Sequence, residues 1–300
     1  MKARQTTHSE YGKIKSILIK PCKNAFVSQD KINTEWKELN FLEAPDYILG
    51  MEEYLIFESI LQENIDKIYE LPFHDEANLD SIYCRDASIV TDHGLILCNM
   101  GKDLRKKEPS LIKEFCNTNE ISILGQIESP GTLEGGDTAW IDEQTLAVGH
   151  TYRTNKSGIG QLKKLLAAFE INVITVELPH YRGMHDVFHL MSIFSPVDRD
   201  VAVVYSPLMP IAFRNELLDR AWHLVEVPEN EFESMGCNVL AMSPRNCVNI
   251  AGNPVTEEGM IKAGCKVTSY EGRNISYLGG GGPTCLTRPL IREITDTGFG

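Results

Sequence analysis

Residues 239–270 read VLAMSPRNCVNIAGNPVTEEGMIKAGCKVTSY. Two short apolar runs, 239–242 and 247–250, are typical of strands, and Ser, Pro and Asn between them favour a turn. Residues 256–263 have apolar positions at helical spacing, and 266–270 again favour a strand. The segment therefore predicts a unit of strand, strand, helix and strand.

This order of elements recurs along the chain. The other predicted units are a strand at 16–20 with a helix between 45 and 71; two strands within 88–100, a helix at 103–116 and a strand at 121–124; a hairpin around 142–144, a helix at 157–169 and a strand at 172–176; and a strand at 200–205, a helix at 212–220 and a strand at 223–227. A spacing of roughly 50 residues is typical of radial or stacked repeats.

We therefore predict an α/β fold over residues 1–300 as a single domain, a five-bladed α/β propeller of ββαβ-like units around a pseudo-fivefold axis. A doubly wound α/β fold is the alternative, although no Gly-rich phosphate loop follows a strand. In a propeller the loops of all units converge at one end of the central channel. Residues from distant units are then expected to share one site.

Composition limits the possible functions. The formal net charge of −13 and the absence of a basic stripe argue against nucleic-acid binding, whereas a cationic small molecule is compatible. Residues 1–10 are polar and no stretch approaches a membrane span, so we expect a soluble, cytoplasmic protein. Eight scattered cysteines without C-x-x-C pairs predict reduced thiols, with Cys98 and Cys247 in the core.

A glycine-rich run near the C-terminus delivers one cysteine. Residues 279–289 read GGGGPTCLTRP, and the glycines and proline constrain the turn that carries Cys285. Such a turn suits the presentation of a nucleophile, although a Gly-rich run alone is also typical of a flexible tail.

Two acidic segments lie in other units. Asp80 and Asp86 bracket a short predicted strand and share one face of it, where two carboxylates suit a cation. Glu134 and Asp137 flank the pair Gly135-Gly136 at a tight bend, which suggests that one acid faces a site while the other anchors the loop.

Basic and imidazole groups complete the set. Arg153, just before a helix, suits bidentate binding of an anion. His185 and His189 have the i, i+4 spacing of a zinc-binding helix, but no H-E-x-x-H motif is present and the apolar flanks favour a strand. We therefore expect no metal. A Cys, a His and several carboxylates instead indicate nucleophilic catalysis on a cationic electrophile such as a guanidinium.

These motifs resemble the guanidino-group-modifying (pentein) superfamily of dimethylarginine dimethylaminohydrolases, arginine deiminases and amidinotransferases. The resemblance covers nearly the whole chain in order, and it is carried by Gly281-Gly282-Pro283-Thr284-Cys285-Leu286, Leu133-Glu134-Gly135-Gly136-Asp137, Arg153-Thr154-Asn155, His189-Leu190-Met191-Ser192, Arg85-Asp86 and residues 10–19. It implies the five-bladed pentein propeller, in agreement with the repeat.

The resemblance also implies roles for individual residues. Cys285 corresponds to the nucleophile, His189 to the general acid and base, and Glu134 to the acid that binds guanidinium and orients the histidine. The implied substrate-binding residues are Asp86, Asp80, Arg153 for the α-carboxylate and Arg105 as its partner, while Asp137 is implied to be structural.

The implied reaction is hydrolysis at the guanidino carbon of arginine or a methylated arginine. It proceeds through a covalent Cys285 thiouronium intermediate, gives citrulline with an amine or ammonia, and needs no cofactor. Met191 stands where arginine deiminases and amidinotransferases carry an aspartate, which favours the dimethylaminohydrolase branch. Against that branch, Arg85 before Asp86 is deiminase-like, and Thr284 replaces the substrate-binding arginine of the deiminases, so the product is left open.

Several alternatives stay open at this stage. They are an amidinotransferase that moves the amidino group from arginine to an amine, an arginine deiminase or dihydrolase, and a pentein-fold binding protein without catalysis. The expected partner is an arginine-like small molecule, with no nucleic acid and no membrane; the oligomeric state, a homodimer included, and any role of His185 are left open.

Overall fold

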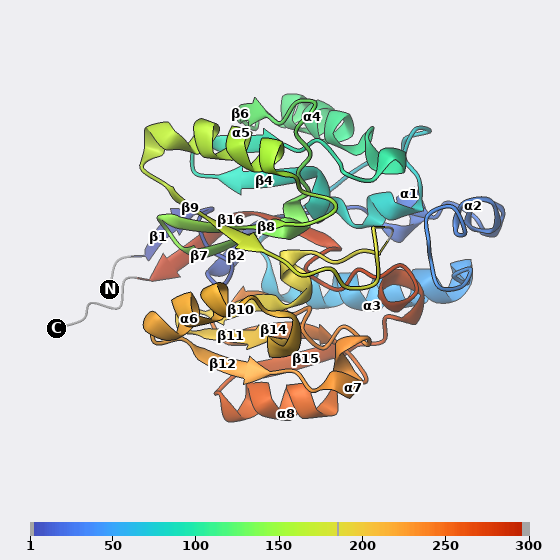
Figure 1. Ribbon diagram of the computed structural model, residues 1–300. Helices are drawn as coiled ribbons and strands as arrows, with labels where there is room; N and C mark the ends of the chain where they lie inside the picture. The colour runs from blue at the N-terminus through green and yellow to red at the C-terminus, as the bar shows by residue number, and fades with distance from the viewer. Residues whose placement is uncertain (1–2, 185, 296–300) are drawn as a thin grey trace.

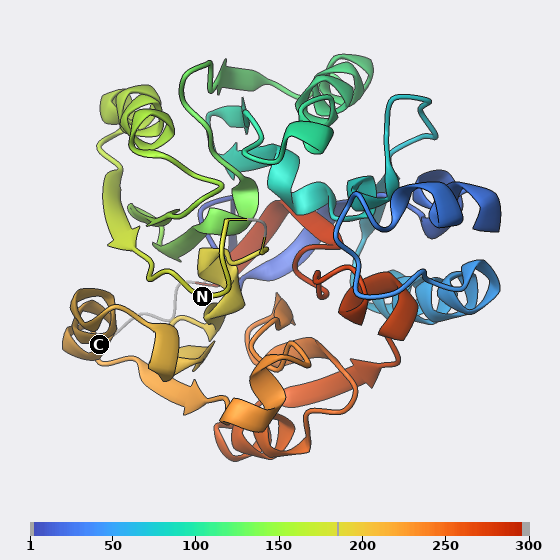
Figure 2. The same cartoon turned by 45° about the vertical axis from the view of Figure 1, so that its right-hand side comes forward.

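The computed structural model describes residues 3–184 and 186–295. It is a mixed α/β fold with five small sheets, which Figure 2 shows arranged in a ring with the longer helices on the outside. Four of the sheets have three strands each and share one pattern. Their strands are β4 (Ser88–Thr91), β5 (Gly94–Leu97) and β6 (Ile123–Gln126); β7 (Thr138–Asp142), β8 (Thr145–His150) and β9 (Asn172–Glu177); β10 (Phe194–Asp198), β11 (Val201–Val204) and β12 (His223–Glu226); and β13 (Leu240–Ser243), β14 (Asn246–Ile250) and β15 (Lys266–Tyr270).

In each of these sheets the first two strands form an antiparallel hairpin and the third lies parallel to the second. A parallel neighbour needs a crossover, and a helix supplies it in every case. The crossover helices are α4 (Glu108–Thr118), α5 (Lys156–Leu166), α6 (Ile211–Asp219) and α8 (Pro254–Lys262), and the short α7 (Glu229–Phe232) follows β12. The predicted strand, strand, helix, strand order is therefore confirmed in three units. In the unit at 200–227 only a strand, a helix and a strand were predicted, and β10 precedes them.

The fifth sheet joins the two ends of the described chain. Its order is β1 (Ala3–Thr6), β16 (Thr287–Thr295), β2 (Lys13–Ile19) and β3 (Lys67–Glu70). β16 is antiparallel to β2, and β3 is parallel to β2 after α1 (Cys22–Ala25), α2 (Gln29–Glu35) and α3 (Tyr47–Asn64). The C-terminal strand thus takes the place that the first hairpin strand occupies in the other sheets (Figure 1).

The apolar patterns explain where the core lies. β11, with the sequence VAVV, is buried at every position, as expected for a strand that lies between two others and is covered on both faces. Three clusters of buried apolar side chains fill the spaces between sheets and helices, and Cys98 and Cys247 are buried in two of them as predicted. None of the helices in the described ranges is long and apolar enough to cross a membrane.

The structure corrects three local predictions. The segment between Asp80 and Asp86 is not a strand but two 3-10 helices, Leu79–Ile82 and Cys84–Ala87, because the Asn78 side chain accepts a hydrogen bond from Asp80 N and starts a turn. His189 lies before a 3-10 turn, Leu190–Ser192, and the strand begins only at Phe194. The helix expected between 45 and 71 ends at Asn64, and β3 follows it.

Candidate functional site

The loops that precede the first strands of the five sheets meet around one pocket of about 440 Å³, here called the central pocket. Asp86, Asn238 and Cys285 each lie two residues before such a strand, since β4, β13 and β16 begin at Ser88, Leu240 and Thr287. His189 precedes β10, and Glu134 precedes β7. The same position therefore contributes to the site in three units, and the segment before the first strand contributes in all five, as expected from the repeat.

The structure brings together the residues that the sequence singled out. The central pocket is lined by Asp80, Asp86, Arg105, Arg153, His189 and Cys285. Glu134 is fully buried directly behind His189 and bonds it through Oε2 at 2.8 Å from Nε2. His185 lies outside the described residues.

Glu134 is held from several sides. Its Oε1 accepts hydrogen bonds from the backbone N–H groups of Gly101 (3.0 Å) and Lys102 (3.1 Å), and Arg153 Nη1 lies 3.5 Å from the same oxygen. Burial raises the pKa of Glu134, but the hydrogen bond and charge of His189 outweigh it, so the pKa falls well below its usual value. Glu134 is therefore a carboxylate that fixes one nitrogen of the imidazole.

The other imidazole nitrogen faces a second carboxylate. His189 Nδ1 lies 3.9 Å from Asp86 Oδ1. Burial lowers the pKa of His189, but the surrounding acids Asp137, Asp86 and Glu134 outweigh it and raise the pKa to about 9. The imidazole is therefore protonated near neutral pH and can deliver a proton.

Gly136 makes this approach possible. A Cβ at this position would lie 2.5 Å from His189 Nδ1 and 2.7 Å from Asp86 Oδ1, closer than any side chain tolerates. Only glycine fits between the Asp86 carboxylate and the His189 imidazole, which explains the glycine at position 136. Asp137 fixes the same loop, because its Oδ1 accepts from Leu190 N and its Oδ2 from the Thr151 hydroxyl.

Asp86 is clamped at one oxygen only. Arg105 Nη1 donates to Oδ2 at 2.6 Å, while the buried Oδ1 has no hydrogen-bond partner. The remaining donors of Arg105 bind Glu108 through two hydrogen bonds of 2.8 Å and the carbonyl of Tyr83 at 2.9 Å. Arg105 thus connects Asp86 to a helix residue, and an unpaired carboxylate oxygen remains at the pocket.

Asp80 and Arg153 occupy different positions in the pocket. Asp80 Oδ2 accepts a 2.5 Å hydrogen bond from Lys102 Nζ, which also donates to the carbonyl of Leu39 at 2.6 Å. Arg153 Nη1 is buried without a hydrogen-bond acceptor, 3.5 Å from Glu134 Oε1. The pocket therefore offers one orphan anionic acceptor, on Asp86, and one orphan cationic donor, on Arg153.

Cys285 is the one cysteine of the chain that is not fully buried. Asn238 Nδ2 donates to its Sγ at 3.3 Å, and the Thr284 hydroxyl lies 3.8 Å from Sγ. Burial, followed by the charge of Asp86, raises the pKa of Cys285, and the Asn238 hydrogen bond opposes this shift. The raised pKa favours the thiol form, and the Asn238 and Thr284 contacts are of the kind that stabilise a thiolate once a cation offsets the charge of Asp86.

Sequence reasoning missed two residues of this pocket, Asn238 and Lys102. Asn238 Oδ1 accepts from Thr284 N at 3.0 Å and from the Thr284 hydroxyl at 2.8 Å, so it orients the turn as well as the sulfur. Its position two residues before a first strand, which Asp86 and Cys285 share, is a signal that could have found it. Lys102 carries no comparable signal, because it reaches Asp80 from a loop before α4.

Three side chains of the site could present ligand atoms to a metal ion. Asp86, Glu134 and His189 offer atoms within 4.8 Å of one another. The donor set fits a cation poorly, because both oxygens of Glu134 already accept hydrogen bonds and Arg105 and Arg153 supply positive charge beside the cluster. We derive no metal-dependent step from it.

Comparison with known proteins places the chain in a family. A model of the arginine deiminase family matches residues 67–220 and 212–292. The protein of Bacillus subtilis named "Uncharacterized protein YkgA" is 28% identical over 287 residues, which is 95% of this chain and 94% of the relative. Arginine deiminase of Listeria welshimeri is 26% identical over 267 residues, 75% of this chain, and the match spans only 64% of that relative.

Two solved structures show the same fold at low identity. A mutant of DDAH (dimethylarginine dimethylaminohydrolase) from Pseudomonas aeruginosa, complexed with citrulline, has a TM-score of 0.75 at 21% identity and covers 92% of this chain and 98% of its own. The amidinotransferase SxtG from Microseira wollei has a TM-score of 0.79 at 14% identity, covering 97% and 98%. The chain belongs to the arginine deiminase family, within the superfamily of guanidino-group hydrolases and transferases.

Proposed function

We propose that this protein is a hydrolase that acts on the guanidino carbon of arginine or of a methylated arginine and releases citrulline with ammonia or an amine. In this proposal the chain is one enzyme domain, a five-bladed propeller with its site at one end of the central channel. The relatives and structural neighbours that act on arginine-like molecules support the substrate class.

One observation carries the proposal. The central pocket leaves Asp86 Oδ1 and Arg153 Nη1 buried and without hydrogen-bond partners. Each atom has an opposite charge within 4 Å, on His189 and Glu134 respectively, but a buried charged atom without a hydrogen bond still costs about 1–3 kcal/mol. A substrate with a guanidinium at one end and a carboxylate at the other pairs both atoms, and no single-charge ligand does.

Guanidinium binding prepares the nucleophile. A cation on Asp86 offsets the charge that raises the pKa of Cys285, so the thiol loses its proton to solvent as the substrate binds. Asn238 and Thr284 then hold the thiolate through the contacts already present. Sγ attacks the guanidino carbon, and a C–S bond forms as the carbon becomes tetrahedral.

His189 serves the departing nitrogen. Since Nε2 is bonded to Glu134, Nδ1 is the atom that faces Asp86 and therefore the guanidinium. Nδ1 donates its proton to the leaving nitrogen, the C–N bond breaks, and a thiouronium remains on Cys285. The neutral imidazole then takes a proton from water, the hydroxide adds to the same carbon, and cleavage of the C–S bond releases the ureido product.

Arg105 is better suited to positioning than to substrate contact. Four of its five N–H donors bind Glu108, Tyr83 and Asp86, so we propose that it orients the Asp86 carboxylate, and that Arg153 takes the substrate carboxylate. Met191 lines the pocket where other members of the superfamily carry an acid, which leaves Asp86 and Asp80 as the guanidinium-facing carboxylates.

The test is a product analysis with purified protein. Arginine, Nω,Nω-dimethylarginine and agmatine are supplied in turn, and citrulline, ornithine, ammonia and dimethylamine are measured by mass spectrometry. We expect citrulline from a substrate with a carboxylate and much slower turnover of agmatine, which lacks one. Cys285→Ser is expected to reduce kcat by about 10⁴-fold or more.

The outcomes separate the alternatives. Dimethylamine with citrulline identifies the dimethylaminohydrolase reaction, ammonia with citrulline the deiminase reaction, and ornithine with ammonia a dihydrolase. Turnover that appears only after an acceptor amine is added contradicts hydrolysis and indicates amidino transfer. Turnover that survives Cys285→Ser refutes the covalent mechanism.

A further inference from the structure

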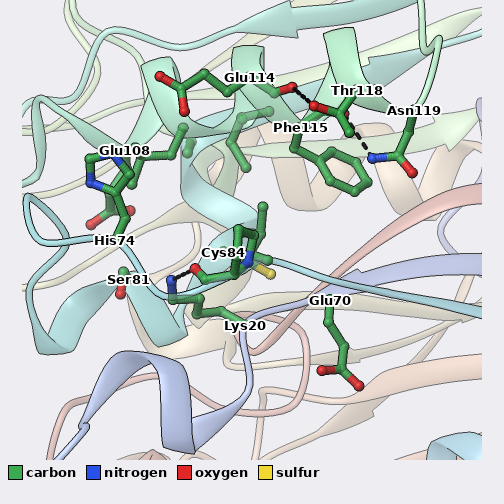
Figure 3. A pocket seen from close by; sticks show the side chains of 15 residues that line it. Lys20, Glu70, His74, Ser81, Cys84, Glu108, Glu114, Phe115, Thr118 and Asn119 are labelled. Carbon is green, nitrogen blue, oxygen red and sulfur yellow. Dashed lines mark hydrogen bonds between the residues drawn. The ribbon is translucent and has the colours of Figure 1, made fainter.

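A second cavity, here called the lateral cavity, lies apart from the central pocket between the end of β3 and helix α4. It has a volume of about 360 Å³, and Figure 3 shows α4 residues on one side and Lys20, Ser81 and Cys84 on the other. Much of the wall is apolar. The apolar lining residues are Leu71, Pro72, Ala87, Leu111, Ile112 and Phe115.

Lys20 places a positive charge in this wall. Lys20 is only 2% exposed. Its Nζ donates one hydrogen bond, to the carbonyl of Pro72, which the dashed line in Figure 3 marks. No carboxylate of residues 3–184 or 186–295 forms an ion pair with it. An ammonium has three N–H donors, so two are left without a partner in a buried position.

Two of the three acids that line the lateral cavity are already engaged, and the third, Glu114, forms no ion pair with Lys20. Both oxygens of Glu108 accept hydrogen bonds from Arg105, and Glu70 Oε2 lies 3.8 Å from Lys23 Nζ. Burial lowers the pKa of Lys20 to about 8 while the charge of Glu108 opposes this, so the ammonium is still the main form at pH 7. A buried cation without its own counter-ion is costly unless a ligand supplies one.

We propose that the lateral cavity is a second small-molecule site, which binds a monocarboxylic acid with an apolar body and pairs its carboxylate with Lys20. The volume lies in the range of small-ligand pockets, and the combination of apolar walls with one buried polar anchor is typical of them. One cation favours a monoanion, and the apolar wall favours an alkyl or aryl group. The proposal does not depend on the chemistry at Cys285.

The experiment measures binding by isothermal titration calorimetry at pH 7 with three matched probes. They are 4-phenylbutyrate, its neutral amide and 4-phenylbutylammonium. We expect the carboxylate to bind about tenfold or more tightly than the amide, because a hydrogen bond to a charged group is lost in the amide. Equal or tighter binding of the ammonium probe, or no binding of the carboxylate, refutes the proposal.

Two variants locate the site. Lys20→Met is expected to remove the preference for the carboxylate, and Leu111→Trp to block binding by filling the cavity from α4. Lys262→Met, which removes an exposed lysine of α8, is the matched control and should leave affinity unchanged. Unchanged carboxylate affinity in both Lys20→Met and Leu111→Trp would mean that the probe binds elsewhere, for example at Arg153, and contradicts the proposal. Circular dichroism establishes that each variant is folded.

Discussion

The central pocket and the lateral cavity are similar in volume but opposite in how their charges are arranged. In the central pocket, acidic and basic side chains lie next to one another. One oxygen of Asp86 and one nitrogen of Arg153 have no hydrogen-bond partner. In the lateral cavity, one ammonium faces an apolar wall. The number and sign of the buried charged groups that lack a partner therefore determine which ligands a cavity binds, more than its volume does.

Neighbouring residues of one segment line the two spaces. Asp86 faces the central pocket, Ala87 and Cys84 line the lateral cavity, and the Glu108–Arg105–Asp86 chain of hydrogen bonds passes between them. Because different side chains line the two sites, each site can be tested separately. Glu108 lines the lateral cavity and bonds Arg105, so a change at Glu108 tests whether the two sites are connected.

Among the changes that distinguish the two cavities, Asp86→Asn is expected to have the largest effect. Loss of the carboxylate removes the partner of the guanidinium and should lower kcat/KM by about 10²–10³-fold, since an interaction between charged groups is lost in a buried site. The same change should speed the alkylation of Cys285 by iodoacetamide in the absence of substrate, because the charge of Asp86 raises the pKa of the thiol. The measurements are steady-state kinetics and mass-spectrometric alkylation rates.

These two readouts must move in opposite directions. Alkylation that slows together with activity would indicate a general disturbance of the pocket and contradict the assigned role. Affinity of the lateral cavity for 4-phenylbutyrate serves as the internal control and should stay unchanged.

The next effect is a contrast in pH dependence. Activity requires the Cys285 thiolate, whose pKa is raised, and the His189 imidazolium, whose pKa is about 9. kcat/KM should therefore rise about tenfold per pH unit from pH 6.5 towards 8.5 and level off near pH 9, where loss of the His189 imidazolium offsets the gain of thiolate. Carboxylate binding in the lateral cavity should weaken as the pH passes about 8, because the Lys20 ammonium is then lost. Parallel profiles for the two sites would contradict their separate assignment.

A smaller effect is expected from Glu108→Gln. Burial raises the pKa of Glu108 to about 7 while Arg105 lowers it, and the amide loses part of the bidentate contact that fixes Arg105. We expect kcat/KM to fall about tenfold through a poorly oriented Asp86, with KM rising more than kcat falls.

A structural role alone would lower stability without that split between KM and kcat. The comparison variant is Glu114→Gln on the same helix, which lines the lateral cavity but does not contact Arg105, and its kinetics should match the wild type. A tenfold loss in both variants would refute the positioning role of Glu108.

The smallest effect is expected from metal removal. Incubation with a chelator, followed by assay with and without added Zn²⁺ or Mg²⁺, should change kcat/KM by less than about twofold, because Arg105, Arg153 and the protonated His189 oppose a cation at the Asp86, Glu134 and His189 cluster. Loss of activity that added metal restores would show that the cluster is a metal site.

Much of the fold was predictable, because each repeated unit has short apolar runs separated by turn residues. In the unit at 239–270, the three strands and the helix were predicted within about two residues of their observed positions. β16 was not predicted, since Pro289 and three charged residues weaken the strand signal and its partner β2 is distant in sequence. Patterns of neighbouring residues do not indicate which distant strand a segment pairs with.

The candidate site was predicted from residue types more than from local structure. Asp80 and Asp86 line one pocket, although the strand expected between them is two 3-10 turns. Asn238 was missed because an asparagine before a strand is common, and only its equivalence to Asp86 and Cys285 in the repeat distinguishes it. The role of Arg105 was not readable, because its contact with Glu108 depends on the turn between Asp103 and α4.

The closure of the fifth sheet by β16 has a consequence for the timing of synthesis. Cys285 lies directly before the strand that pairs with β1 and β2, so it is among the last of the described residues to leave the ribosome. A nascent chain can form the sheets of β4 to β15 while it still lacks the nucleophile. In the proposed mechanism, the Cys285 sulfur therefore reaches the pocket only when β16 has paired with β1 and β2, after the other four sheets can already have formed.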